Sequence, residues 1–329
     1  MCYSAMVEQH LRSLAREFRA EVDWDLFETL FRERLEYEDI KVTPALEANF
    51  TDPARLTGES EIERSIGFLI EAHRRKLAES LEREAFRQRK RLADARRSLE
   101  HRHTKRAQEE ERIALSKIES LLARLGDFKR SEPLESDRRI FPLYFAPLIV
   151  EHAGRRLVRP MRYTCRLPGK PASCDARYPG TYNARRDNLR GFWAELFGKR
   201  HGILAITSFF ENVPRHLFER RELAPGEKPK NLVLHFDPQP RAQMLVACLW
   251  AHWTAPPSGA PDARELYSFA AITDEPPPEI AATGHNRCVI PLKPSNVDQW
   301  LAPEGVSPER LDQILTDRDR PYYEHRIAA

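Results

Sequence analysis

Removal of Met1 would leave two nucleophiles side by side at the start of the chain. Met1 is followed by Cys2, and an initiator methionine before a small residue is normally trimmed. An N-terminal cysteine carries an α-amine with a pKa of about 8 beside a thiol with a pKa of about 8.5. This pair suits an aldehyde, because the amine condenses to a Schiff base and the thiol then closes a five-membered thiazolidine. Taken alone, a cysteine at position two is more often an accident than a catalyst.

Three other short segments hold side chains suited to acid–base work or anion binding. Glu211 ends the apolar run 202–210, where a carboxyl group can have a raised pKa; the alternative is a strand-end charge that points to solvent. The tripeptide Asn-Ala-Arg at 183–185 is, alone, an unremarkable loop sequence. His285 lies just before the apolar run 288–292, with an arginine two residues on. A single histidine of this kind is more often structural than catalytic.

The order of these segments is more specific than any one of them. It resembles the SOS-response-associated peptidase (SRAP) family, over residues 1–6 and about 139–302. A further segment, 144–147, is an imperfect counterpart of the family's Tyr-x-x-Ala-Pro. The matching elements are Cys2, residues 183–185, 209–211, 247–250, 269–273 and 285–287.

The resemblance implies a chemistry and a role for four side chains. Family members form a stable thiazolidine between the N-terminal cysteine and the ring-opened sugar of an abasic site, and the domain can also remove its own leading residues. Cys2 matches that nucleophile, and Asn183 matches the residue that holds the amine and the opened sugar. Glu211 matches the carboxylate that shuttles protons. His285 matches the histidine that polarises or protonates the sugar oxygen.

The resemblance also implies a partner, which is single-stranded DNA with abasic sites. Arg185 and Arg287 match arginines that bind the phosphates flanking the lesion, and Arg162 keeps a usual basic position. Single-stranded DNA exposes the reacting C1′ without any cost of unpairing.

Several positions depart from the family pattern. Tyr3 and Ser4 replace the usual Gly and Arg, so one phosphate contact is missing, and Asn212 replaces a Trp. The family's Trp-Gly-Leu becomes Tyr-Thr-Cys at 163–165. A basic stretch at 83–106, with ten Lys or Arg and three acids, could replace lost phosphate contacts; the alternative is a solvated helix face.

Two other functions remain open at this point. Cys2 could serve a thiol peptidase or amidase of the N-terminal-nucleophile type, which needs an oxyanion site and a peptide groove. Alternatively, a degenerate domain could act as a nucleic-acid or protein-binding scaffold, with the helical segment binding a protein partner or a second copy. The departures at Tyr3, Ser4 and Asn212 motivate this last reading.

Composition and charge restrict how the protein could bind nucleic acid and where in the cell it is expected. The formal net charge is only +3, so nucleic acid must be met by a local basic patch. The first sixteen residues lack an apolar signal region, and no apolar run is long enough to span a membrane. We therefore expect a cytoplasmic protein, nucleoid-associated when it is bound to DNA. The spacing of the five cysteines fits no metal site, so we expect neither metal nor cofactor.

The elements that must position these residues divide the chain into two parts. Helical periodicity runs over 7–35 and over 60–125, and the longer helix is expected to fold back between 87 and 106. Short apolar runs at 140–150, 202–210, 231–236, 244–250, 268–273 and 288–292 predict strands. Short helices are expected at 189–197 and 308–316. The prediction is an α+β fold, with a mostly antiparallel domain of residues 1–6 and 139–329 and a helical insertion, 7–138.

Overall fold

The computed structural model describes residues 2–56, 60–128, 130, 132–254 and 264–328, and for Cys2 it describes the backbone. Helix and strand are mixed, which confirms the predicted α+β class. The strands are β1 (Cys2–Val7), β2 (Glu21–Val22), β3 (Lys41–Val42), β4 (Arg139–Ile140), β5 (Tyr144–His152), β6 (Arg155–Tyr163), β7 (Asn183–Arg185), β8 (His201–Pro214), β9 (Asn231–Gln239), β10 (Met244–Trp253), β11 (Leu266–Asp274), β12 (Cys288–Val289), β13 (Pro291–Leu292) and β14 (Tyr322–Ile327). The helices are α1 (Leu11–Glu17), α2 (Trp24–Glu36), α3 (Pro44–Thr51), α4 (Glu61–His101), α5 (Lys105–Asp127), α6 (Cys174–Arg177), α7 (Arg215–Phe218), α8 (Pro278–Ala281), α9 (Val297–Leu301) and α10 (Pro308–Thr316), with 3-10 turns η1 (Glu135–Arg138), η2 (Arg186–Asn188) and η3 (Pro294–Asn296).

Five strands close on one another in a ring of hydrogen-bonded ladders. The order is β10, β11, β6, β5, β8 and back to β10, and the β11–β6 ladder is parallel while the other four are antiparallel. Because side chains alternate between the two faces of a strand, one set points into the ring. Leu148, Met161, Leu204 and Phe269 belong to this set, and they are buried in one apolar cluster. The ring therefore encloses a packed core.

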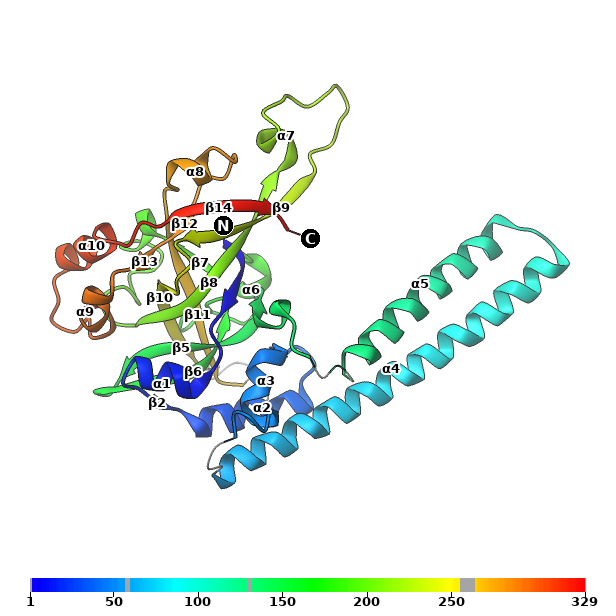
Figure 1. Cartoon of the computed structure of the whole chain (residues 1–329), viewed down its shortest axis with the longest axis horizontal. Helices are drawn as coiled ribbons and strands as arrows, with labels where there is room; N and C mark the ends of the chain where they lie inside the picture. The colour runs from blue at the N-terminus through cyan, green and yellow to red at the C-terminus, as the bar shows by residue number, and fades with distance from the viewer. Residues whose placement is uncertain (1, 57–59, 129, 131, 255–263, 329) are drawn as a thin grey trace.

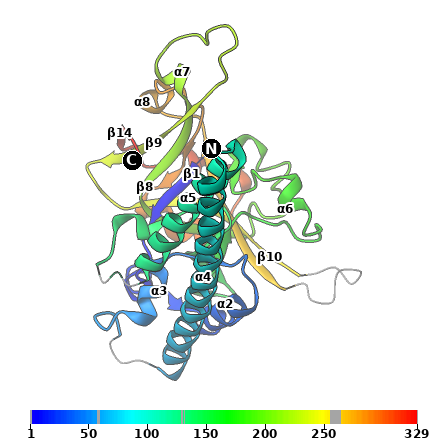
Figure 2. The same cartoon turned by 90° about the vertical axis from the view of Figure 1, so that its right-hand side faces the viewer.

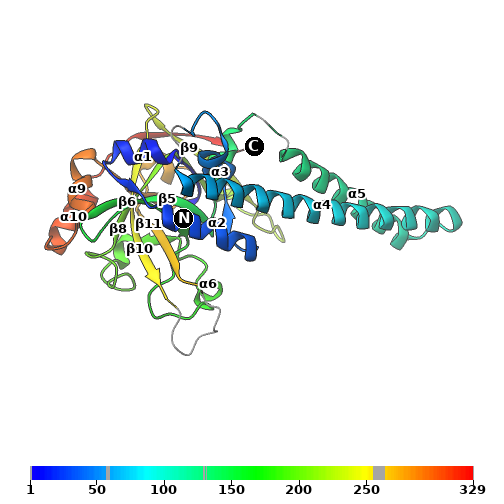
Figure 3. The ribbon, with the colours of Figure 1, turned by 90° about the horizontal axis from the view of Figure 1, so that it is seen from below.

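Helices cover the outer face of the ring. The opposite set of strand side chains, with Ile149 and Ile203 among them, packs against buried residues of α1, α2, α3, α9 and α10. Helices α1 and α2 contact β6, and the first part of α4 packs on α2 and α3 (Figure 3). Each of the helices α2 and α3 starts at a side-chain cap, where Asp23 accepts from the Leu26 amide and Thr43 accepts from the Leu46 amide. The caps fix where these helices begin and thereby which side chains face the sheet.

The single helix predicted over 7–35 is wrong. The segment instead contains the end of β1, then α1, β2 and α2. Arg19 has a φ of 50°, in the left-handed region, so the backbone leaves the helix there. Glu21 and Val22 then pair in parallel with β6 at residues 157 and 158. The apolar periodicity is present, but it is divided between two helices that pack on the same sheet.

Helices α4 and α5 form a long antiparallel hairpin, called the arm below. Helix α4 has 41 residues, a length of about 60 Å, and begins at a capping box formed by Ser60 and Glu63. The arm projects from the body and its far end is free (Figures 1 and 2). The turn between His101 and Lys105 lies within the segment 87–106, where the helix was expected to fold back.

The predicted helical segment 7–138 therefore has two parts with different surroundings. Residues from Leu11 to Ile70 contribute Phe27, Phe50 and Ile66 to the core cluster on the outer face of the ring. Farther along α4, Leu81 packs only with nearby arm residues in a small separate cluster. The inner part is integral to the body, whereas the outer part is an appendage.

The N-terminal strand lies in an extension of the sheet beyond the ring. Strand β8 is 14 residues long, and its second half pairs with β1 on one side and with β9 on the other. Strand β4 pairs with the free side of β1, and β14 pairs with β9. The start of the chain is thus held between two strands that come much later in the sequence.

The remaining local predictions are confirmed in part. The six predicted strand regions all contain strands, and the predicted helix 308–316 is α10. Residues 189–197 form successive turns rather than the predicted helix. Residues 183–185, interpreted from sequence as a loop, form the short strand β7, which pairs in parallel with β11. The other strands that were not predicted are β1, β2, β3, β6 and β14.

Candidate active site

The backbone of Cys2 lies directly opposite Glu211. The two residues are Cα partners in the β1–β8 ladder, and the register shifts between positions 2 and 4. At this irregularity, the Tyr3 amide donates a hydrogen bond to Oε2 of Glu211 at 3.3 Å. The carboxyl group of Glu211 is therefore held against the backbone of the first described residues of the chain.

Glu211 and His285 form a buried pair. Nε2 of His285 lies 3.4 Å from Oε2 of Glu211, and the Glu211 side chain is 0% exposed. Burial raises the pKa of Glu211 to about 8 and lowers the pKa of His285 to about 4. Near neutral pH, both groups are therefore uncharged, with the proton on the carboxyl group. The sequence placed these two residues 74 positions apart, and the fold brings them into contact.

The tautomer of His285 follows from its second contact. Nδ1 lies 2.9 Å from the carbonyl oxygen of Arg287, which can only accept. This contact is shorter than the 3.3 Å between the Arg287 amide nitrogen and the same Nδ1. The proton of the neutral ring is accordingly on Nδ1, and Nε2 presents a lone pair to the Glu211 carboxyl group.

Asn183 and Thr273 lie where three strands meet. Residues 271 and 273 of β11 pair with Asn183 and Arg185 of β7, and residue 273 also pairs with Val289 of β12. Asn183 is 6% exposed and Thr273 is 1% exposed. Neither the Asn183 amide group nor the Thr273 hydroxyl has a hydrogen-bond partner among the residues that the structure describes. Buried polar atoms left without partners are costly, so they are candidates for contacts with a ligand.

Thr273 was missed as a site residue. Thr273 is the last residue of the segment 269–273, which carries part of the family resemblance. This position in the sequence could have identified it as a candidate site residue.

Arg287 and Arg185 lie on the same side of this junction. Burial lowers the pKa of Arg287, and the positive charge of Arg185 lowers it further, which shows that the two guanidinium groups are close enough to repel. Glu211 acts on Arg287 in the opposite direction. Arg185 is exposed and paired with Asp187 at 2.5 Å. The structure thus brings Arg287 close to Glu211, and Arg185 close to Arg287.

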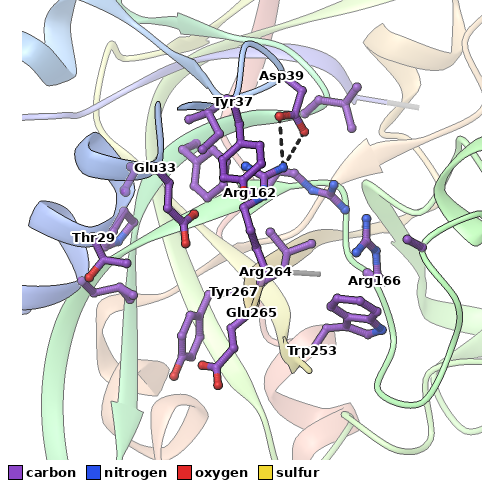
Figure 4. A pocket seen from close by; sticks show the side chains of 18 residues that line it. Thr29, Glu33, Tyr37, Asp39, Arg162, Arg166, Trp253, Arg264, Glu265 and Tyr267 are labelled. Carbon is purple, nitrogen blue, oxygen red and sulfur yellow. Dashed lines mark hydrogen bonds and ion pairs between the residues drawn. The ribbon is translucent and has the colours of Figure 1, made fainter. Parts of the chain in front are cut away.

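Arg162 lies elsewhere. It pairs with residue 268 of β11, five positions before Thr273 and so about 17 Å along the strand. Its guanidinium is buried, 2.8 Å from Asp175, and also donates to the carbonyl oxygen of Thr164. It lines a cavity of about 460 Å³ between α2 and the ring, together with Arg166 and other residues shown in Figure 4. The charge predicted to bind phosphate is therefore already engaged.

Arg139 is a basic residue whose strand, β4, pairs with the first strand of the chain, β1. It was not among the predicted site residues. Its Nε donates to Oγ of Ser4 at 2.9 Å, and its guanidinium lies 3.5 Å from the ring centre of Phe210 and 4.9 Å from that of Phe141. The Tyr3 ring lies 5.6 Å from Phe141. Arg139 has no carboxylate within ion-pair distance in the described part of the chain. Ser4 replaces an arginine of the family pattern, and Arg139 places a cation next to it.

Of the other cysteines, three are buried and Cys174 is partly exposed. Cys165, Cys248 and Cys288 are buried, and burial raises the pKa of each thiol, that of Cys165 to about 12. Among the described residues, no group of His, Cys, Asp and Glu is placed to hold a metal ion. Within those residues, too, no helix is long and apolar enough to cross a membrane.

Comparison with known proteins adds a family and several solved structures. The model of the family described as SOS response associated peptidase (SRAP) matches residues 100–327, more than half of the chain. A protein from Bacteroides thetaiotaomicron is similar at TM-score 0.45 and 16% identity, over 58% of this chain and 77% of that one. A protein from Bordetella bronchiseptica gives 0.44 and 18%, over 58% and 87%, and a phage-related protein from the same organism gives 0.41 and 16%, over 58% and 80%. No curated protein matches the chain.

Proposed function

Because the chain belongs to the SOS response associated peptidase (SRAP) family, we propose that it captures abasic sites in single-stranded DNA covalently through Cys2. The observation that carries this proposal is the uncharged Glu211–His285 pair beside the strand that holds residue 2. Aldehyde capture requires a proton donor next to an amine, and a carboxyl group with a pKa of about 8 is protonated at neutral pH.

The proposed reaction proceeds in three steps after removal of Met1. The α-amine of Cys2 attacks C1′ of the ring-opened sugar and forms a carbinolamine. Glu211 gives its proton to the carbinolamine hydroxyl, which leaves as water, and a C=N bond forms. The Cys2 sulfur then attacks C1′ and closes the thiazolidine, while the thiol proton returns to the Glu211 carboxylate. One water is released, and Glu211 ends as it began.

The proposed role of His285 follows from its protonation state. With a pKa of about 4, the ring is neutral near pH 7 and its Nδ1 proton is used by a backbone carbonyl. His285 can therefore pass to the sugar oxygen only a proton that Nε2 has first taken from Glu211. The two residues would act as one relay, with the histidine on the side of the sugar.

Other residues would bind the DNA. The buried amide of Asn183 and the hydroxyl of Thr273 are suited to the hydroxyl groups of the opened sugar, since they have no other partners within the described residues. Arg287, Arg185 and Arg139 supply the cations for adjacent phosphates. Among these, Arg139 would take the part of the arginine that Ser4 lacks.

The test is incubation of the protein with single-stranded DNA that carries one abasic site, followed by a denaturing gel. Intact-mass measurement first establishes that Met1 has been removed. A heat-resistant shifted band that disappears in Cys2→Ala is the expected result. A protein with a free Cys2 that gives no such band contradicts the proposal.

A further inference from the structure

Positive charge is concentrated at the outer end of the arm. Residues 87–106 contain nine Lys or Arg and two acids, Asp94 and Glu100, so this segment has a net charge of +7. The whole chain has a net charge of +3, so the remainder is net −4. A body with a net negative charge repels a polyanion at long range, and the attraction has to come from a local basic surface.

Part of this charge is used within the arm. Arg91 pairs with Glu110 at 2.5 Å and Arg96 pairs with Glu111 at 2.9 Å, which ties α4 to α5. Other basic residues at this end are exposed and make no ion pair within the described residues: Arg89, Lys90, Arg102, Lys105 and Arg106. The interhelical pairs connect α4 to α5 at this end of the arm, and the unpaired cations leave it basic.

The shape of this end restricts how it could contact nucleic acid. Small buried side chains, Ala95 and Ala107, let the two helices pack closely. Two helices side by side are about 20 Å wide, whereas the major groove of DNA is about 12 Å wide. The pair is too wide to enter the groove and read bases. It can contact phosphates on the outside of a duplex, which is a sequence-independent mode of binding.

We propose that the tip of the arm, residues 87–106, binds the phosphate backbone of double-stranded DNA next to the single strand at the candidate active site. This inference rests on the proposed function for the location of the single strand. From Leu77 to His101 the arm extends about 36 Å, which is the length of about 11 base pairs. A duplex is stiff over this distance and can be held at both ends, whereas a flexible single strand cannot. The preferred DNA would therefore be a junction between single and double strands.

Two variants with the same change in charge test the proposal. The tip variant replaces four exposed tip residues by Gln: Arg89, Lys90, Arg102 and Lys105. The control variant replaces four exposed body residues, which also make no ion pair within the described residues, by Gln: Arg16, Arg19, Lys199 and Arg241. Circular dichroism checks that both variants keep their helix content.

Binding is measured by fluorescence anisotropy at several salt concentrations. The probes are a junction with about 20 base pairs of duplex and a single strand of about 8 nucleotides, neither of which contains an abasic site. The tip variant is expected to bind the junction at least about tenfold more weakly, and its slope of log K against log salt should be smaller in magnitude by roughly 3. Its binding of the short strand should equal that of the wild type, and the control variant should bind both probes like the wild type.

Three results would overturn the proposal. The first is a tip variant that binds the junction as the wild type does. The second is an equal loss in the tip and control variants, which would indicate a general charge effect. The third is a tip-dependent affinity for phosphatidylserine vesicles without any tip-dependent affinity for the junction. Crosslinking of a short abasic strand is scored separately, so its failure would count against the proposed function and leave the measured role of the arm standing.

Discussion

Replacement of Glu211 by Gln removes the carboxyl proton of this side chain and keeps its size and shape. Burial raises the pKa of Glu211 to about 8, so roughly nine-tenths of the carboxyl group is protonated at pH 7, against less than about 1% at an ordinary carboxyl pKa. Glutamine has nearly the same size and is uncharged, like the protonated acid. Glu211→Gln should therefore fold as the wild type does at pH 7, but it cannot transfer a proton.

The expected effect on crosslinking is a loss of rate by about 10²- to 10⁴-fold, the usual contribution of a positioned acid or base. The wild-type rate should have a bell-shaped pH profile, because the Cys2 amine must lose its proton while Glu211 keeps its own. The residual rate of Glu211→Gln should rise with pH to a plateau, without the fall above about pH 8.

The assay is single-turnover crosslinking of an abasic single strand between pH 5.5 and 9.5, quantified on denaturing gels. Glu324→Gln is the control, because Glu324 is an exposed carboxylate on β14 whose partner is a surface glutamine. The reasoning is refuted if Glu211→Gln crosslinks at the wild-type rate with an unchanged pH profile. A loss of rate that retains the fall at high pH would refute the assignment of that fall to Glu211.

Three further predictions concern stability and binding. Asn183→Leu should reduce crosslinking and leave the free energy of unfolding nearly unchanged, because the Asn183 amide has no partner within the described residues. The control is Asn49→Leu, which removes buried hydrogen bonds to Gln9 and Leu11. This control should lower the free energy of unfolding in urea by roughly 2 kcal/mol or more. Arg139→Gln should weaken binding of single-stranded DNA and reduce the magnitude of its salt slope by about 0.7, whereas Arg200→Gln, which changes a similar arginine 4.5 Å from the Trp250 ring at the other end of β8, should alter neither. Between pH 4.5 and about 8 the folded protein keeps the Glu211 proton that the unfolded chain releases, so Glu211 should lower the free energy of unfolding with rising pH by up to roughly 4–5 kcal/mol relative to Glu211→Gln. The lowered pKa of His285 gives a change of the opposite sign below about pH 6.5, so the measured quantity is the difference between the pH profiles of the wild type and Glu211→Gln in urea unfolding.

Among the strands that carry the site, β8, β11 and β12 were predictable because their apolar runs are short and clearly bounded, whereas β1 and β7 were not predicted. Glu211 could be recognised as a strand-end acid, since the run before it is mostly apolar. Its contact with His285 and the resulting neutral pair depend on the meeting of β8 with the segment before β12, which periodicity cannot specify. The same holds for Arg139, whose importance comes from its position beside Ser4 in space.

Differences between the expected and the observed surroundings of residues have local causes. Arg162 and Tyr163 are adjacent on β6, and their side chains point to opposite faces, so a one-residue difference decides which of them meets the ring interior. The break at Arg19 requires a left-handed backbone conformation, which the presence of an arginine does not predict. Strand β6 was missed because four arginines interrupt its apolar pattern, yet their stems pack against neighbouring residues and their charged ends find carboxylates such as Asp23 and Asp175.

The placement of β1 between β8 and β4 has a consequence for the order of assembly. This strand is synthesised first, but its partner at Glu211 follows 209 residues later, whereas α4 and α5 can pair as soon as both have emerged. At a synthesis rate of about 5–20 residues per second, roughly 10–40 seconds would pass after the synthesis of β1 before it can pair with β8. During this interval the start of the chain would be accessible to an aminopeptidase, because β1 has not yet paired with β8. The reactive residue would thus be exposed while the chain is incomplete and become functional only when the last third of the chain has been made.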